Sequence, residues 1–267
     1  MPDNDTPDRT LAERVSVAPP GFYRVRLDIE YDGTDFVGWQ TQASQHGRTV
    51  QHTLEAAIER VTGCAVRSVG AGRTDTGVHA TGQVAHFDTQ WSRPPEVLQR
   101  ALNAVLPPDV AVVGLTETQP TFHARYDALE REYVYTILNR PLRAPLRART
   151  AWHVPEPLDV EAMRAACGVF LGRYDFRALG RPMRERGSTV RTVTAVAALT
   201  HADEVMITVR ADAFLRHMAR RMTFALVEVG RGRLSPSDVA TIVASADPSL
   251  LRGIAPPQGL CLVRVIY

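Results

Sequence analysis

The chain has 267 residues, 45% of them hydrophobic, which is enough to bury one large core or two modest ones. Its formal charge of +2 and its pI near 8.6 are only mildly basic, so net charge gives weak support for a polyanionic partner. All 31 Lys+Arg residues are arginine, and the absence of lysine excludes a pyridoxal Schiff base, a Walker-type phosphate lysine and a kinase-type strand lysine.

The first half of the chain is expected to start after a tail. Residues 1–21 carry four prolines among mixed charges and no sustained apolar period, which predicts a disordered tail. Residues 25–31 alternate apolar and charged side chains, the pattern of a half-buried strand. Apolar residues then recur at helical spacing, which predicts a helix that begins after a Thr49 cap and ends at Gly63. Strands at 65–69 and 83–87, a helix at 94–105 and a strand at 110–115 complete an N-terminal half over residues 22–120.

A second half, residues 121–267, repeats this logic. We expect strands at 132–138, 189–199, 205–209 and 260–266, with helices at 158–171 and 213–229 and a short helix from Ser235. The central strand pairs lack intervening helices, which favours antiparallel pairing. The sequence therefore predicts an α+β protein with mixed or antiparallel sheets.

The three cysteines, Cys64, Cys167 and Cys261, stand far apart and in no metal-ligand spacing. This spacing argues against a zinc site and against a disulfide framework, and their mostly apolar neighbours predict buried thiols in a reducing compartment. No signal peptide or long apolar span is evident in the sequence. We therefore expect a cytoplasmic protein.

Two connections of the second half are rich in arginine. Residues 139–150 hold four arginines and no acid, and residues 177–191 hold five arginines with Glu185 as the lone acid. Such runs suit contacts with a phosphate backbone, although either run alone could be an ordinary solvated loop.

The segment from Gly70 to Ala80, GAGRTDTGVHA, has the composition of a functional loop. It does not fit a dinucleotide-binding loop, because the third glycine is misplaced and a strand pattern follows where that motif needs a helix. Asp75, two residues after Arg73, could be a turn residue that caps neighbouring amides. Alternatively, a guanidinium holds the carboxylate ionised and oriented, so that it serves as nucleophile or base.

Several ordered strings resemble the TruA family of tRNA pseudouridine synthases over almost the whole chain, from about Tyr23 to Tyr267. They are GAGRTDTGVHATGQVAHF from residue 70, FVGWQTQ at 36–42, FHARYDALEREYVY at 122–135, LGRYDF at 171–176, ADAFLRHMAR at 211–220 and GLCLVRVIY at 259–267. The resemblance implies the pseudouridine synthase fold, in which two similar α/β-sandwich halves share a mixed, largely antiparallel sheet around a central basic cleft. It also implies isomerisation of uridine to pseudouridine in the anticodon stem-loop of tRNA, at positions 38, 39 and 40. The implied enzyme is a homodimer that binds tRNA and needs neither metal nor cofactor.

The same resemblance implies roles for four residues. Asp75 matches the catalytic aspartate, and Arg73 matches the arginine of the same string, expected to engage Asp75 or the RNA. Tyr133 matches the tyrosine that lies against the target base, and Arg220 matches the ion-pair partner of the aspartate. Without the family, Tyr133 would be core filling in a strand and Arg220 a solvent-facing residue of an amphipathic helix.

Other features qualify this interpretation. His79, His86 and His123 have no metal-binding spacing and are expected to be structural. Arg221 stands where the family usually carries asparagine, which puts helix packing and nearby RNA contacts in doubt. Two other functions stay open: a non-catalytic RNA-binding protein, and an N-glycosidic hydrolase that would release free uracil.

Overall fold

The computed structural model describes residues 17–40, 47–183 and 187–267. Its centre is one ten-stranded sheet in the order β4-β1-β3-β10-β5-β9-β8-β7, with β2 beside β3 and β6 beside β5. The pairs β10–β3 and β5–β6 are parallel, and the other pairs are antiparallel. The predicted α+β class with a mixed, largely antiparallel sheet is confirmed.

The elements are as follows. The strands are β1 (Tyr23–Tyr31), β2 (Val69–Gly70), β3 (His79–Thr89), β4 (Val110–Thr118), β5 (Glu130–Asn139), β6 (Trp152–Val154), β7 (Gly172–Asp175), β8 (Val190–His201), β9 (Glu204–Ala211) and β10 (Leu260–Ile266). The α-helices are α2 (Val50–Thr62), α3 (Pro95–Val105), α4 (Val160–Cys167), α5 (Met218–Gly230) and α6 (Pro236–Ser245). None of the described helices is long and apolar enough to span a membrane.

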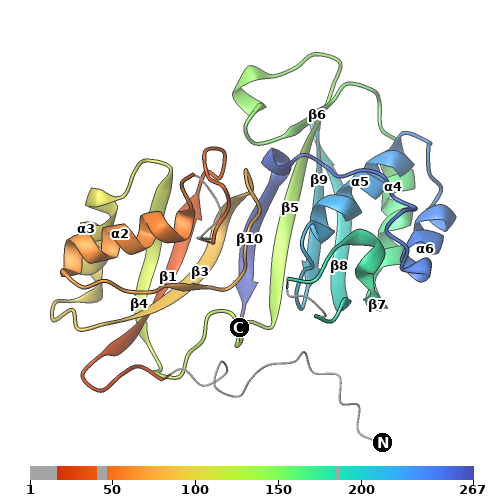
Figure 1. Cartoon of the computed structure of the whole chain (residues 1–267). Helices are drawn as coiled ribbons and strands as arrows, with labels where there is room; N and C mark the ends of the chain where they lie inside the picture. Colours follow the sequence, from red (N-terminus) through yellow and green to blue (C-terminus); the bar gives the residue numbers. More distant parts are fainter. Residues whose placement is uncertain (1–16, 41–46, 184–186) are drawn as a thin grey trace, which may run out of the picture.

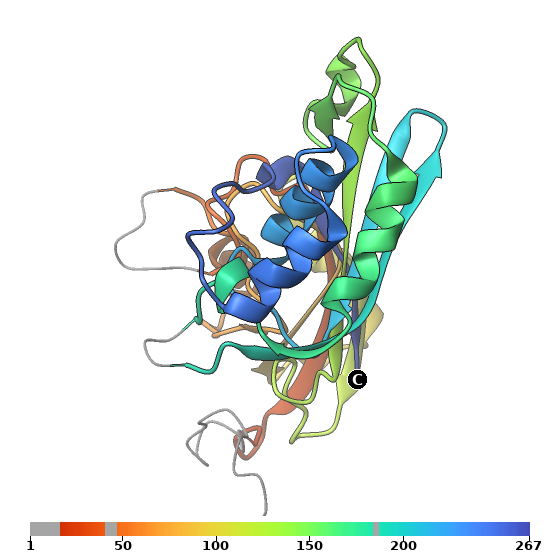
Figure 2. The ribbon, with the colours of Figure 1, turned by 90° about the vertical axis from the view of Figure 1, so that its right-hand side faces the viewer.

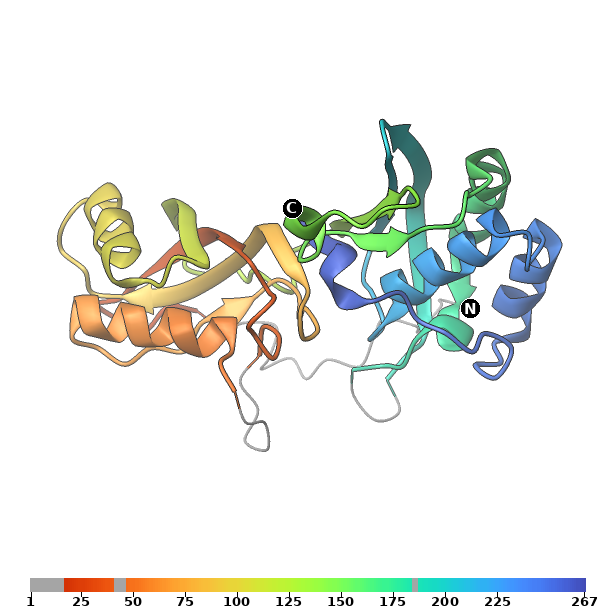
Figure 3. The same cartoon turned by 90° about the horizontal axis from the view of Figure 1, so that it is seen from above.

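The helices form two groups at the two ends of the sheet (Figures 1 and 3). Helices α2 and α3 pack together at the end that contains β4, β1 and β3, while α4, α5 and α6 gather at the other end. Viewed from the β7 side, α5 and α6 lie together on one side of the strands (Figure 2). The predicted caps are present: the Thr49 hydroxyl accepts from His52 N–H, and Gly63 ends α2 in a left-handed conformation.

The last strand of the chain joins the two ends of the sheet. Leu262 of β10 pairs with Ala80 of β3 on one side and with Tyr133 of β5 on the other. Strand β3 begins directly after the Gly70–Val78 loop, so this register brings that loop close to Tyr133. The two predicted halves thus share one continuous sheet, and the boundary between residues 120 and 121 stays a prediction.

Some local expectations were wrong. The helix predicted from residue 213 begins at Met218, because His217 takes a left-handed conformation with φ of +70° and Arg216 pairs with Arg181 in a β-bridge. In place of the strand expected at 65–69 the structure has the two-residue strand β2, Val69–Gly70. The short strands β6 and β7 were not predicted. Cys64 is exposed, because it directly follows the end of α2. Residues 1–16 of the predicted tail lie outside the described residues.

Candidate active site

A pocket of about 120 Å³ opens where three segments distant in sequence meet. Its lining includes residues 71–75 of the loop before β3, Tyr133 of β5 and residues 213–220 at the start of α5. Asp75, Arg73, Tyr133 and Arg220 all line this pocket. The structure therefore brings the four predicted site residues together.

The loop that carries Asp75 is fixed by hydrogen bonds on both sides. The hydroxyls of Tyr31 and Thr74 lie 2.8 Å apart, and Gln83 Nε2 donates to the Gly72 carbonyl at 3.0 Å. Trp39 N–H donates to the Thr74 carbonyl at 3.1 Å. These bonds hold the backbone before the aspartate, and Gly77 N–H donates to the Phe36 carbonyl at 3.3 Å after it, so the direction of the carboxylate is set by the fold.

Gly38, in the upstream string, fits closely against the same loop. Its φ is +100°, and a Cβ atom at this position would lie 2.6 Å from the Thr74 carbonyl oxygen. Only glycine combines this backbone conformation with this close approach. The described part of the string, residues 36–40, therefore supports the Asp75 loop, and residues 41 and 42 lie outside the described residues.

The Asp75 carboxylate faces two cationic or potentially cationic groups through one oxygen. Arg220 Nη1 lies 3.5 Å from Oδ2 and His217 Nε2 lies 3.7 Å from the same atom. Arg220 is itself oriented by a 2.7 Å hydrogen bond from its Nε to the Ala255 carbonyl. Among the described residues, no donor makes a hydrogen bond to Oδ1. The carboxylate is thus oriented through Oδ2, and the Asp75 side chain is 26% exposed where it lines the pocket.

Arg73 and Arg220 hold different positions around the pocket. The Arg220 side chain is 12% exposed, and burial lowers the pKa of its guanidinium while the Asp75 charge raises it. The Arg73 side chain is exposed and lines the pocket. Arg220 therefore lies within ion-pair distance of Asp75, and Arg73 lies where it can contact a ligand that enters the pocket.

Tyr133 forms part of the inner wall of the pocket. The residue is 7% exposed, and its ring meets Phe214 edge-on with 5.0 Å between centroids. Burial, and secondly the charge of Asp75, raise the pKa of the Tyr133 phenol, so it stays neutral at physiological pH. Tyr133 is thus both a core residue and a pocket residue, and the two interpretations from the sequence are compatible.

Two pocket residues escaped the sequence interpretation. His217 lies inside a stretch predicted to be helical. In the structure it is a loop residue with a left-handed backbone conformation next to Asp75, and no sequence signal indicates this. Burial lowers the pKa of His217, and the Asp75 charge opposes this effect. Arg131 occupies the core-facing register of β5 with Tyr133 and Tyr135, and a charged residue in that register was a signal that could have been used.

The arginine-rich runs are less uniformly cationic in three dimensions than in sequence. In the first run, Arg140 pairs with Asp203 at 2.9 Å and Arg147 pairs with Glu204 at 2.6 Å, so distant acids partly neutralise the run. In the second, Arg177 pairs with Asp175 at 3.3 Å, and residues 184–186 lie outside the described residues. Arg221, which departs from the family pattern, donates to the Ala178 carbonyl at 2.9 Å.

The three histidines expected to be structural have backbone partners. His79 Nδ1 accepts from Gly33 N–H and its Nε2 lies 2.7 Å from the Arg149 carbonyl. His86 Nδ1 accepts from Ala124 N–H, and His123 Nδ1 accepts from Arg125 N–H. Within the described residues, no cluster of three or more His, Cys, Asp or Glu side chains could hold a metal ion.

An oriented carboxylate in an arginine-rich pocket, on this mixed sheet, defines a class: an enzyme whose chemistry depends on a carboxylate. Comparison with known proteins narrows the class. A family described as tRNA pseudouridine synthase matches residues 29–127 and 166–267. The chain is 46% identical over 249 residues to tRNA pseudouridine synthase A of Solidesulfovibrio magneticus, covering 91% of each chain. It is 44% identical to tRNA pseudouridine synthase A of Myxococcus xanthus, covering 91% of this chain and 92% of that one.

The chain belongs to the tRNA pseudouridine synthase family. The resemblance noted in the sequence is therefore confirmed, and so is the predicted enzyme class, an isomerase that acts on uridine in tRNA.

Proposed function

We propose that the chain isomerises uridines in the anticodon stem-loop of tRNA and that the Asp75 carboxylate performs the chemistry. In this reaction the bond from C1′ to N1 breaks, the uracil turns within the site, and a new bond forms from C1′ to C5. The ionised carboxylate either attacks C1′ or removes the 2′ proton. The observation that carries the proposal is the Asp75 carboxylate, which lines the pocket, is 26% exposed and is oriented through Oδ2 by Arg220.

Arg220 acts in this proposal as the electrostatic partner of Asp75. Its guanidinium is directed by the Ala255 carbonyl and lies 3.5 Å from Asp75 Oδ2. An adjacent fixed cation fixes the direction of the carboxylate before the substrate binds. The carboxylate therefore needs little reorganisation when the substrate arrives.

Tyr133 acts as a surface for the detached base. An aromatic ring in the pocket wall can stack on uracil while the base turns, which keeps the base from leaving. Its neutral phenol can also take part in hydrogen bonding while the C5 proton is removed.

Substrate binding requires the target nucleotide to leave the RNA stack. While the nucleotide is stacked within the RNA helix, a side chain in the pocket cannot reach its C1′. We assign Arg73, which is exposed on the pocket, to the RNA during this step. The proposed enzyme is a homodimer and works without metal or cofactor, because the single carboxylate with its cations supplies the groups the reaction needs.

The test uses purified protein with EDTA and no added cofactor on unmodified tRNA transcripts, with pseudouridine located by chemical mapping. We expect pseudouridine in the anticodon stem-loop with the wild-type protein and none with Asp75→Ala. Tight RNA binding without modification would favour a binding protein, and release of free uracil would favour an N-glycosidic hydrolase. Size-exclusion chromatography with light scattering tests the dimer.

A further inference from the structure

Arg131 is a buried cation held by backbone carbonyl groups. The residue is 9% exposed and lies in β5 on the same face as Tyr133, two residues before it. Within the described part of the chain it forms no ion pair with a carboxylate. A buried guanidinium without a carboxylate is uncommon, because desolvation of a charge must be offset by other polar contacts.

Four carbonyl groups provide those contacts. Arg131 Nη1 donates to Ala128 at 2.9 Å and to Asp212 at 2.7 Å. Arg131 Nη2 donates to Ala71 at 3.0 Å and to Arg125 at 2.6 Å. The guanidinium therefore uses two donors on each terminal nitrogen, and no contact depends on the side chain of an acceptor.

The four acceptors belong to separate segments of the chain, and two of them, Ala71 and Arg125, line the pocket. Ala71 lies in the loop of Asp75, four residues before the catalytic carboxylate. Asp212 precedes the segment that carries His217 and Arg220. The Oδ1 atom of Asp212 accepts a hydrogen bond from Thr192 N–H of β8. Arg125 and Ala128 belong to the connection that leads into β5. One side chain thus joins the Asp75 loop, the strand of Tyr133 and the segment before α5.

We propose that Arg131 is a positioning residue that sets the distance between the Asp75 loop and the segments carrying Tyr133 and Arg220. This inference rests on the proposed function of Asp75. The Asp75 loop precedes β3, Tyr133 lies in β5 and Asp212 directly follows β9, and the guanidinium of Arg131, itself a β5 residue, bonds to the first and the last of these segments. A displacement of about 1 Å between reacting groups lowers a rate by up to about a hundredfold, so a link of this kind matters for catalysis.

The geometry requires arginine rather than any cation. A guanidinium is planar and spreads its donors over two terminal nitrogens, whereas a lysine ammonium concentrates three donors on one atom. Lysine at position 131 would keep the charge but could not reach four carbonyls on two sides. Arg131→Lys therefore removes the link while preserving the charge.

The experiment compares Arg131→Lys with a matched control, Arg24→Lys. Arg24 is also a fully buried arginine of the same sheet, bonded to Asp88 and to the Phe122 carbonyl, but it does not line the pocket. Single-turnover rates of pseudouridine formation, tRNA dissociation constants and melting temperatures are measured for both. For Arg131→Lys we expect a rate about ten- to a hundredfold below wild type and a dissociation constant within about threefold. For Arg24→Lys we expect a lower melting temperature and an unchanged rate of the folded protein.

A second variant tests the link chemically. In Arg131→Ala, guanidinium ion at millimolar concentration should restore part of the single-turnover rate with saturation, and ammonium ion should not. A purely structural role predicts instead that Arg131→Lys and Arg24→Lys behave alike, with rates following the folded fraction. That outcome, or a loss of tRNA affinity equal to the loss of rate, would overturn the inference. If wild type and Asp75→Ala are equally inactive, the proposed function itself has failed.

Discussion

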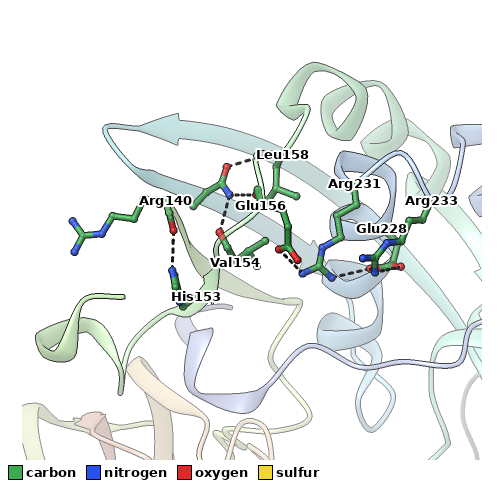
Figure 4. Close-up of polar contacts among 9 residues, drawn as sticks. Arg140, His153, Val154, Glu156, Leu158, Glu228, Arg231 and Arg233 are labelled. Atoms are coloured by element: carbon green, nitrogen blue, oxygen red, sulfur yellow. Dashed lines mark hydrogen bonds and ion pairs between the residues drawn. The ribbon is translucent and has the colours of Figure 1, made fainter. Parts of the chain in front are cut away.

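The two ends of helix α5 carry similar charged groups in different arrangements. At its N-terminal end, Asp75 meets Arg220 and His217 at 3.5 and 3.7 Å, both through Oδ2. At its C-terminal end, Glu228 contacts Arg231 at 3.0 Å and Arg233 at 3.5 Å (Figure 4). Both ends therefore combine a carboxylate with nearby cations.

The two ends differ in how far carboxylates and guanidiniums balance each other. Arg231 also reaches Glu156 at 3.3 Å, so the C-terminal cluster holds two carboxylates and two guanidiniums in one network (Figure 4). Cations beyond the end of a helix are also favoured by its dipole. At the other end, one carboxylate faces a pocket lined by several arginines. A balanced network suits stability, and an oriented carboxylate that lines a pocket suits chemistry.

Replacing an arginine at each end of α5 should give the largest difference in reaction rate. Arg220→Gln should lower the single-turnover rate about 10²- to 10³-fold, because a preorganised charge next to the reacting carboxylate is lost. Arg231→Gln should leave the rate unchanged and lower the free energy of unfolding by about 1–2 kcal/mol. Rate measurements and urea denaturation of both variants check this. Equal rates for the two variants would contradict the distinction.

A smaller effect is expected from two tyrosines of β5. Tyr133→Phe keeps the aromatic face and loses the hydroxyl next to Gly72 of the Asp75 loop, so the rate should fall by up to about tenfold, the value of one ordinary hydrogen bond. Tyr135 donates to the Pro256 carbonyl at 2.7 Å, so Tyr135→Phe should cost about 1 kcal/mol of stability and no rate. Single-turnover kinetics and thermal melting separate the two. A Tyr133→Phe enzyme with the wild-type rate would restrict Tyr133 to stacking.

The smallest effect concerns a titratable group outside the pocket. Burial lowers the pKa of His86 from 6.5 to about 3. Between these values the unfolded chain binds a proton that the folded chain does not, so stability falls as pH falls from about 6.5 toward 3. The loss should reach about 2 kcal/mol at pH 5. In His86→Asn, urea unfolding between pH 7 and 5 should show a flatter dependence, and an equally steep one would contradict this origin.

The sequence predicted elements whose local signals agree with their tertiary environment. The period-two pattern of β1 and the Thr49 and Gly63 caps of α2 both operate within a few residues, and both appear in the structure. The start of α5 was misplaced because the bridge between Arg181 and Arg216, and the left-handed His217, depend on segments distant in sequence.

For the site, the four residues and the pairing of Arg220 with Asp75 were expected from the family strings, and the other contacts were not. The four predicted residues line one pocket, although no periodicity indicated that Arg220 would point to Asp75. The carbonyl partners of Arg131 and the acids that neutralise the first arginine-rich run come from elsewhere in the chain. Such contacts follow from topology, which local patterns do not encode.

The measurement that tests the central claim most directly compares Asp75→Asn with Glu228→Gln, the two carboxylates at the ends of α5. Both substitutions remove a charge and keep a similar shape. Single-turnover pseudouridine formation and tRNA dissociation constants are measured for each. Asp75→Asn should lose at least about 10³-fold in rate with tRNA affinity within about threefold, and Glu228→Gln should keep the wild-type rate. Retained turnover in purified Asp75→Asn would contradict the assignment of Asp75 as the reactive carboxylate.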